Sequence, residues 1–202
     1  MSRWPRKYIV GVTGNICAGK SAVCNILEDI GAQIIDADII THDVMKSYGP
    51  VFKDIVEEFG EKILNNKGEI DRKILGQIVF SDKSSLNRLE LLLHPMIRSK
   101  IEETILDSND GVIVVEAIKL LESGLSNHCD TVWVVNASFE QRSERLIQRD
   151  NINAKEAQNR LRMQGPQELK LQQADVIIEN SRSLEETYVQ VWHEWGKIEM
   201  PK

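Results

Sequence analysis

The segment GVTGNICAGKSAV, residues 11–23, contains the spacing G-x-x-x-x-G-K-S, which binds phosphate when it lies between a strand and a helix. Gly14 and Gly19 permit backbone angles that a side chain disfavours. Lys20 places a positive charge beside the β- and γ-phosphates of a nucleotide, and the Ser21 hydroxyl is a ligand for Mg²⁺. An apolar run precedes the motif and a helical pattern follows it, so its N–H groups meet phosphate at the positive end of a helix. The motif predicts a site for ATP and Mg²⁺.

The residues between the two glycines mainly contribute backbone N–H groups, so their side chains need not prevent phosphate binding. A chance glycine-rich turn is the alternative, and the strand and helix on either side of the loop disfavour it. Together with the glycines, Lys20 and Ser21, the predicted ATP-binding residues are Asn15, Ile16, Cys17, Ala18 and Ala22.

Three carboxylates follow predicted strands, at the edge of a parallel sheet where ligands gather. Asp36 and Asp38 lie in IIDADIITHDV, and a carboxylate there can orient an attacking hydroxyl or accept its proton during phosphoryl transfer. Helix capping is an equally good explanation for an aspartate at this place. Glu116 ends the third strand, either as a partner in the magnesium site or as a polar residue after a buried strand.

Arginines are concentrated on two successive helical segments near the C-terminal end of the sequence: Arg142, Arg145, Arg149, Arg160 and Arg162. Arg145 and Arg149 are four residues apart and share a helix face. A solvated, salt-bridged face is the ordinary explanation of such a pattern. Because a phosphate loop is also present, we favour a mobile lid over residues 142–170 that closes on ATP, with both arginines meeting phosphate and Arg145 serving catalysis.

The elements that must position these residues are five short Val- and Ile-rich runs, which are nearly continuously apolar, as strands covered on both faces are. The predicted strands are residues 8–12, 33–35, 112–115, 131–135 and 176–178. Helical patterns lie between them, and the interval 44–107 carries helical patterns and no strand. This order predicts an α/β fold, a three-layer domain with a parallel five-stranded sheet over residues 1–202, a helical insert at about 44–107 and a helical lid.

Helix boundaries follow from capping signals. A helix over residues 21–30 ends before Gly31, and Ser138 and Asn153 each begin a capping box. Pro95 suits the first turn of a helix that contains Ile97. In the last helix a single apolar face is predicted to pack on the core: Leu184, Tyr188, Val191, Trp192 and Trp195.

Composition excludes several classes of function. The chain is 42% hydrophobic and 28% charged, as a soluble globular protein is. A net charge of −6 argues against a general electrostatic contact with nucleic acid. No membrane span or signal peptide is expected, and three cysteines without metal-ligand spacing predict free thiols in the cytoplasm. The sequence does not establish the oligomeric state, and a monomer is favoured.

Several strings, in their order and spacing, resemble the dephospho-coenzyme A kinase family. Beyond the phosphate loop they are IIDADI, FGEKILNNKGEIDRKILGQIVF, LLLHPMI, VVEAIKLLESGL, Gln164 and ADVIIEN. The resemblance implies a phosphate-loop kinase fold and transfer of phosphate from ATP to the ribose 3′-hydroxyl of dephospho-coenzyme A, the last step of coenzyme A biosynthesis. It also implies that Asp38 is the catalytic base, that the helical insert helps to bind dephospho-coenzyme A, and that the arginine helix belongs to the lid.

Some positions depart from the family pattern. The family loop is usually richer in glycine than Asn15 and Cys17 allow, and His42 and Arg142 stand where arginine and glutamine are common.

Another phosphate-loop nucleoside or nucleotide kinase is the main alternative, because it would keep the loop and the lid. A GTP-dependent switch is disfavoured, since the nearest string to its guanine-reading motif, residues 66–69, lies between helices. A non-catalytic nucleotide-binding subunit is disfavoured by the intact Lys20, Ser21 and Asp38.

Overall fold

The computed structural model describes residues 4–109 and 111–200. Contacts within the chain divide it into two compact units. Unit 1 contains the described residues of Met1–Ile35 and Asn109–Lys202, and unit 2 contains Asp36–Ser108. The polypeptide therefore leaves unit 1 once, forms unit 2 as one continuous stretch, and returns.

Unit 1 is built on a sheet whose five strands agree with the five predicted runs, each strand being one or two residues longer. Their order is β2-β3-β1-β4-β5, and β1 pairs in parallel with β3 and β4, as β4 does with β5. The strands are β1 (Lys7–Thr13), β2 (Gln33–Asp36), β3 (Gly111–Glu116), β4 (Thr131–Asn136) and β5 (Val176–Glu179). The predicted α/β class and five-stranded sheet are confirmed.

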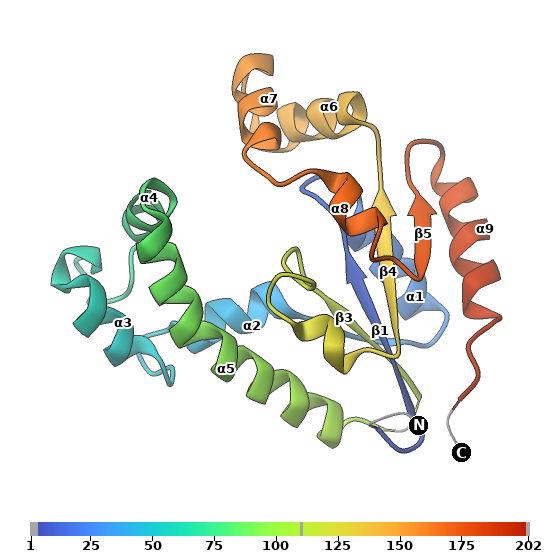
Figure 1. Ribbon diagram of the computed structural model, residues 1–202, viewed down its shortest axis with the longest axis horizontal. Helices are drawn as coiled ribbons and strands as arrows, with labels where there is room; N and C mark the ends of the chain where they lie inside the picture. The colour runs from blue at the N-terminus through green and yellow to red at the C-terminus, as the bar shows by residue number, and fades with distance from the viewer. Residues whose placement is uncertain (1–3, 110, 201–202) are drawn as a thin grey trace. The chain divides into compact units, whose positions relative to one another are not determined.

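Helices cover both faces of this sheet (Figure 1). The helices of unit 1 are α1 (Lys20–Asp29), η2 (Leu125–His128), α6 (Phe139–Asp150), α7 (Ala154–Arg162), α8 (Gln167–Leu171) and α9 (Leu184–Trp195). Of these, α6 and α7 pack on each other beyond the ends of the strands (Figure 1). On one face α1 and α9 pack together, with Leu27 and Val191 fully buried against Val12 and Trp133 of the sheet. On the other face Gly11 is so close to Leu120 and Cys129 that an added Cβ would lie 2.7 and 2.8 Å from them. Tight packing at the centre fixes the C-terminal ends of the strands, where the phosphate loop begins.

The capping signals of α6 and α7 are confirmed: the Ser138 hydroxyl accepts the N–H of Gln141, and the Asn153 side chain accepts that of Glu156. Both helices begin one residue after their caps, as predicted. The sequence predicts that the second helix runs to about Gln164, and α7 ends two residues earlier, at Arg162.

The predicted apolar face of α9 is wrong in part. Leu184 and Trp192 are 62% and 54% exposed, whereas Thr187 and Val191 are fully buried. The buried row therefore runs through positions 187 and 191, and the row 184, 188, 192 lies on the outer side of the helix. Thr187 takes a core position because its hydroxyl finds a buried partner, which the apolar pattern alone does not reveal.

Unit 2 is helical, with α2 and α4 packed on α5. It comprises α2 (Ala37–Val44), α3 (Phe52–Phe59), η1 (Glu61–Ile63), α4 (Arg72–Ser81) and α5 (Lys83–Asp107). Asp82 caps α5 by accepting the N–H groups of Ser84 and Ser85. Hydrogen bonds from the hydroxyls of Ser85 and Ser84, and then these N–H groups, hold the pKa of its carboxyl well below the usual range.

The start of a new helix at Pro95 is wrong, because Pro95 lies inside the 25-residue helix α5. A proline in a helix interior removes one backbone hydrogen bond and favours a break. In α5 buried side chains recur every four residues on both sides of Pro95, at Leu89, Leu93, Ile97, Ile101 and Ile105. The continuous buried row stabilises the helix through the proline.

Candidate active site

Two glycines of the phosphate loop, residues 14–21, are required by their surroundings as well as by their backbone angles. At Gly14 φ is +153° and an added Cβ would lie 2.5 Å from the Val135 carbonyl oxygen. At Gly19 φ is +97° and a Cβ would lie 1.9 Å from the side-chain nitrogen of Asn180. Side chains are excluded at both positions, so the loop backbone can approach its neighbours closely.

The N-terminus of α1 has no side chain that caps it. Its N-cap is Gly19, no side-chain capping hydrogen bond is present among the described residues, and the first turn contains no acidic residue. Uncapped N–H groups and the positive end of the helix dipole form a site for an anion.

Lys20 is the charged residue of this site. Its side chain is 8% exposed, and within residues 4–109 and 111–200 no hydrogen bond or ion pair engages its ammonium group. A buried cation is costly unless an anion accompanies it. The arrangement is therefore complementary to a bound phosphate.

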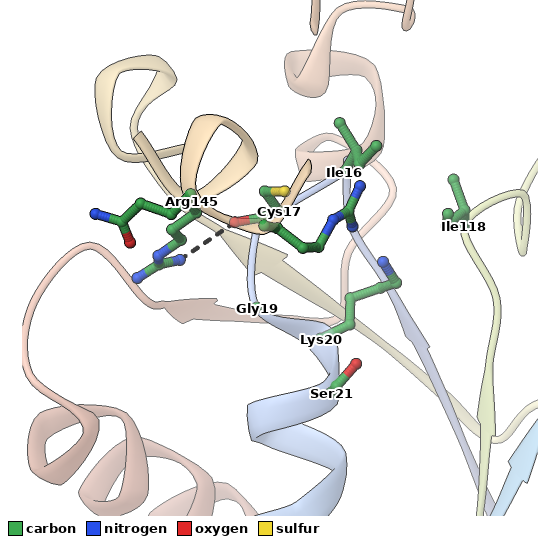
Figure 2. A pocket seen from close by; sticks show the side chains of 9 residues that line it. Ile16, Cys17, Gly19, Lys20, Ser21, Ile118 and Arg145 are labelled. Carbon is green, nitrogen blue, oxygen red and sulfur yellow. Dashed lines mark hydrogen bonds between the residues drawn. The ribbon is translucent and has the colours of Figure 1, made fainter. Parts of the chain in front are cut away.

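The loop opens onto a cavity of about 520 Å³, a volume in the range of small-molecule sites. Figure 2 shows Lys20 and Ser21 at its wall, opposite Ile118. All of its lining residues belong to unit 1: Ile16, Cys17, Gly19, Lys20, Ser21, Ile118, Arg145, Gln148 and Arg149. Most of these residues are predicted from the sequence, and Ile118 and Gln148 are not.

Arg145 lines the cavity and also supports the loop from behind. Its guanidinium donates to the backbone carbonyl of Cys17 at 3.3 Å (Figure 2). It also donates to the backbone carbonyls of Ala18 at 3.2 Å and Asn180 at 2.7 Å. Three carbonyl acceptors hold the planar group in one orientation. The side chain predicted to meet phosphate is thus bonded to the phosphate loop itself.

Arg149 is more exposed and pairs with its neighbour, since its Nε lies 2.8 Å from the Asp150 carboxylate. This hydrogen bond raises the pKa of Arg149 and lowers that of Asp150. Arg160 also pairs with Asp150 and with Glu156. Part of the arginine cluster therefore forms surface ion pairs, which was the alternative considered from the sequence.

The non-glycine residues of the loop contact the 142–170 segment. The Asn15 side chain donates to the Gly165 carbonyl at 3.2 Å, and the Ile16 N–H donates to the Gln164 side chain at 2.8 Å. Ile16 and Cys17 also pack against an apolar cluster formed by Leu146, Ala157 and Leu161 of α6 and α7. Asn15 and Cys17, which replace the glycines usual in the family loop, therefore both contact the 142–170 segment.

Arg142, another departure, is buried at the start of α6, with its guanidinium over the ring of Phe139. Burial lowers the pKa of Arg142. Its Nε and Nη1 are buried without a hydrogen-bond partner among the described residues. In contrast to Arg145, it makes no hydrogen bond to the phosphate loop there.

The carboxylates take different places. Asp36 caps α2, accepting the N–H groups of Asp38 and Ile39 at 2.7 and 3.1 Å, so the capping explanation holds for this residue. Asp38 is exposed in the first turn of α2, within unit 2. Glu116 ends β3 in register with Val12 of the neighbouring β1, whereas β2 is separated from β1 by β3.

Asn180 is a buried residue of the site that the sequence motifs do not predict. It directly follows β5, and its side-chain nitrogen donates to the Ala18 carbonyl at 2.8 Å. It lies in the string ADVIIEN, where an asparagine after an apolar strand was the available signal.

The fold and the loop define the class of protein. A sheet in the order β2-β3-β1-β4-β5, with a glycine loop between β1 and α1, is the fold of phosphate-loop kinases. The solved structure of shikimate kinase from Bacteroides thetaiotaomicron shares this fold, with a TM-score of 0.53 over 95% of this chain and 99% of that one, at 16% identity.

Sequence comparison identifies the family within this class. The profile of the dephospho-CoA kinase family matches residues 8–186. The dephospho-CoA kinase of Moorella thermoacetica is 35% identical over 196 residues, which cover 95% of this chain and 92% of the relative. The solved structure of dephospho-CoA kinase from Campylobacter jejuni is 34% identical, with a TM-score of 0.69 over 95% of this chain and 96% of that one. The chain belongs to the dephospho-CoA kinase family.

Proposed function

We propose that the protein transfers the γ-phosphoryl group of ATP to the ribose 3′-hydroxyl of dephospho-coenzyme A, giving coenzyme A and ADP. Membership of the family supports the substrate. The observation that carries the reaction type is the buried Lys20 at the uncapped N-terminus of α1, which matches a polyphosphate in charge and position.

The phosphate loop binds the β- and γ-phosphates through its N–H groups and through Lys20. Arg149, at the wall of the cavity, adds positive charge near the same phosphates. Arg145 contributes a charge beside the loop while it holds the loop carbonyls, a role that supports transfer without requiring direct contact. Because the transition state of phosphoryl transfer is loose, positioning and charge stabilisation supply most of the catalysis.

Ser21 is the residue that fits a magnesium ion. Its hydroxyl is a hard oxygen ligand at the cavity wall, one residue after Lys20. Mg²⁺ commonly takes one or two protein oxygens and completes its shell with phosphate and water. When bound, Mg²⁺ neutralises charge on the phosphates that leave and transfer.

Asp38 is our choice for the group that orients the acceptor hydroxyl and takes its proton. Asp36 is engaged as a helix cap, which supports Asp38 over its neighbour. The support for an aspartate in this role is its position in the family's Asp-x-Asp element. The helical insert at about 44–107 binds dephospho-coenzyme A, and residues 142–170 act as a lid over ATP.

We also propose that the protein acts as a monomer in the cytoplasm, without nucleic-acid or membrane partners. Cys17, Cys24 and Cys129 have no metal-ligand spacing, which agrees with a reducing compartment, and the net charge of −6 disfavours nucleic acid. Among the described helices, none is long and apolar enough to cross a membrane.

The test is to incubate the protein with ATP, Mg²⁺ and a panel of hydroxyl acceptors, and to identify products by mass. We expect a single phosphate added to dephospho-coenzyme A, at a rate well above that for any nucleoside or nucleotide. Position 3′ is checked by comparing the product with authentic coenzyme A. Faster phosphorylation of a nucleoside would instead favour another phosphate-loop kinase.

A further inference from the structure

Asn180 uses every one of its polar groups inside unit 1. It is 5% exposed. Its backbone N–H donates to the Asn136 carbonyl at 2.7 Å, and its carbonyl accepts from Arg145 at 2.7 Å. Its side-chain nitrogen donates to Ala18 at 2.8 Å, and its side-chain oxygen accepts from the Thr187 hydroxyl at 2.9 Å. One residue therefore joins the end of β5, helix α9, helix α6 and the phosphate loop.

The orientation of the Asn180 carboxamide follows from its partners. The Ala18 carbonyl can only accept a hydrogen bond, so the group that faces it must be the NH₂ of the carboxamide. The oxygen is then directed to Thr187, whose hydroxyl can donate. Thr187 is fully buried, so this hydroxyl is held away from competing water.

These contacts fix the direction of a peptide group in the phosphate loop. In a trans peptide the C=O and the following N–H point in opposite directions. Asn180 and Arg145 both donate to the Ala18 carbonyl, so the N–H of Gly19 is directed away from them. Gly19 lines the cavity, and its N–H is one of the groups available to a phosphate at this end of α1.

The fit between Gly19 and Asn180 is close enough to require glycine. A Cβ at position 19 would lie 1.9 Å from the Asn180 side-chain nitrogen, shorter than any ordinary contact. The glycine of the motif thus makes room for the Asn180 carboxamide at the Ala18 carbonyl.

We infer that Asn180, held by Thr187, is a positioning residue for nucleotide binding: it orients the Ala18–Gly19 peptide so that the Gly19 N–H faces the phosphates. This inference relies on the proposed binding of ATP at the loop. It does not require Asn180 to touch the nucleotide.

The experiment uses the Asn180→Asp variant. This substitution keeps the shape of the side chain and an acceptor for Thr187, but it removes the NH₂ donor. A carboxylate facing the Ala18 carbonyl also repels it. Affinity is measured by calorimetric titration with Mg²⁺ and a non-hydrolysable ATP analogue, and initial rates give KM for each substrate. We expect the Kd and the KM for ATP to rise about tenfold or more, as loss of about 1.4 kcal/mol implies. With ATP saturating, the KM for dephospho-coenzyme A should remain within about twofold of the wild-type value, because the nucleotide then occupies the loop.

Two comparisons separate positioning from general destabilisation. Val191→Ala opens a cavity on the same helix and should lower Tm while leaving the nucleotide Kd near the wild-type value. Thr187→Val should weaken nucleotide binding, and Thr187→Ser, which keeps the hydroxyl, should bind more tightly than Thr187→Val.

The inference is overturned if Asn180→Asp binds the analogue as the wild type does, or if Val191→Ala loses affinity equally at the same loss of Tm. If the wild type binds the analogue but does not phosphorylate dephospho-coenzyme A, the proposed function fails while the role of Asn180 is still tested by Kd.

Discussion

Lys20 combines burial, positive charge and a place next to the uncapped end of α1. The Lys20→Met substitution keeps a side chain of similar length but removes its charge. We expect ATP binding to weaken by roughly 1.5–3 kcal/mol, the range for a hydrogen bond to a charged group. Turnover should fall further, because the charge on the transferring group increases in the transition state. Calorimetric titration and initial rates measure the two effects.

The matched control for Lys20 is Lys197→Met, which removes an exposed ammonium that pairs with Glu194 on the surface of unit 1. It changes the net charge by the same amount as Lys20→Met does. ATP affinity and turnover should both stay near their wild-type values. Equal turnover in Lys20→Met and the wild type would contradict phosphate binding by Lys20.

Single substitutions decide which of the three carboxylates, Asp36, Asp38 or Glu116, is the catalytic base. Asp38→Asn keeps the shape but cannot accept the proton, so we expect kcat to fall by about 10²–10⁴ with ATP affinity nearly unchanged. Asp36→Asn is the control, because asparagine caps a helix about as well as aspartate does. Glu116→Gln tests the carboxylate at the end of β3. If Asp38→Asn retains a near-normal rate while Glu116→Gln or Asp36→Asn abolishes it, the proposed base is wrong.

At the scale of elements, the strands and the phosphate loop could be predicted because their signals are local. Buried parallel strands consist of continuous Val and Ile, and the loop motif lies at one place in the sequence. Asn180 could not be placed in this way, since its partners Ala18 and Thr187 come from distant parts of the chain. The burial of Thr187 depends on the same contact, which is why the inner row of α9 was misassigned.

Helix α5 shows a second limit of local reasoning. Pro95 signals a helix start locally, whereas the buried row from Leu89 to Ile105 favours one continuous helix, and packing decides. The predicted bounds of the helical insert and of the lid remain predictions, because segment boundaries alone do not establish what either segment binds.

The 142–170 segment is the element in which ATP should cause the largest change. Gln164 accepts from the Ile16 N–H, and Ile16 and Cys17 pack on the cluster of α6 and α7, so ordering of the loop reaches both helices. We expect ATP with Mg²⁺ to slow amide hydrogen exchange across residues 142–170. In Gln164→Ala, which removes the side-chain acceptor, the slowing should be smaller.

Helix α4 of unit 2 is the internal reference for this exchange experiment, because every residue that lines the phosphate cavity belongs to unit 1. Its protection should change less than that of α6 and α7. Equal protection of residues 142–170 with and without nucleotide would favour the salt-bridged surface, of which Asp150, Arg149 and Arg160 already form a part.

At the scale of the whole molecule, the division into two units suggests a division of binding. All lining residues of the phosphate cavity belong to unit 1. Unit 2 exposes large apolar side chains at Ile39, Tyr48 and Phe80, the last being 72% exposed, as unit 1 does on the outer side of α9. Exposed apolar groups of this kind are suited to contact the adenine and the long pantetheine arm of dephospho-coenzyme A.

We therefore predict that the acceptor slows hydrogen exchange mainly in residues 36–108 when the phosphate loop is already occupied. The protein is first saturated with Mg²⁺ and a non-hydrolysable ATP analogue, because dephospho-coenzyme A itself carries phosphates that could enter the loop. Adding dephospho-coenzyme A should then give further protection in unit 2, whereas adenosine at the same concentration should give little, since it lacks the pantetheine arm. If the further protection were confined to unit 1, the helical insert would not be the acceptor-binding element, even though the kinase reaction itself could still be observed.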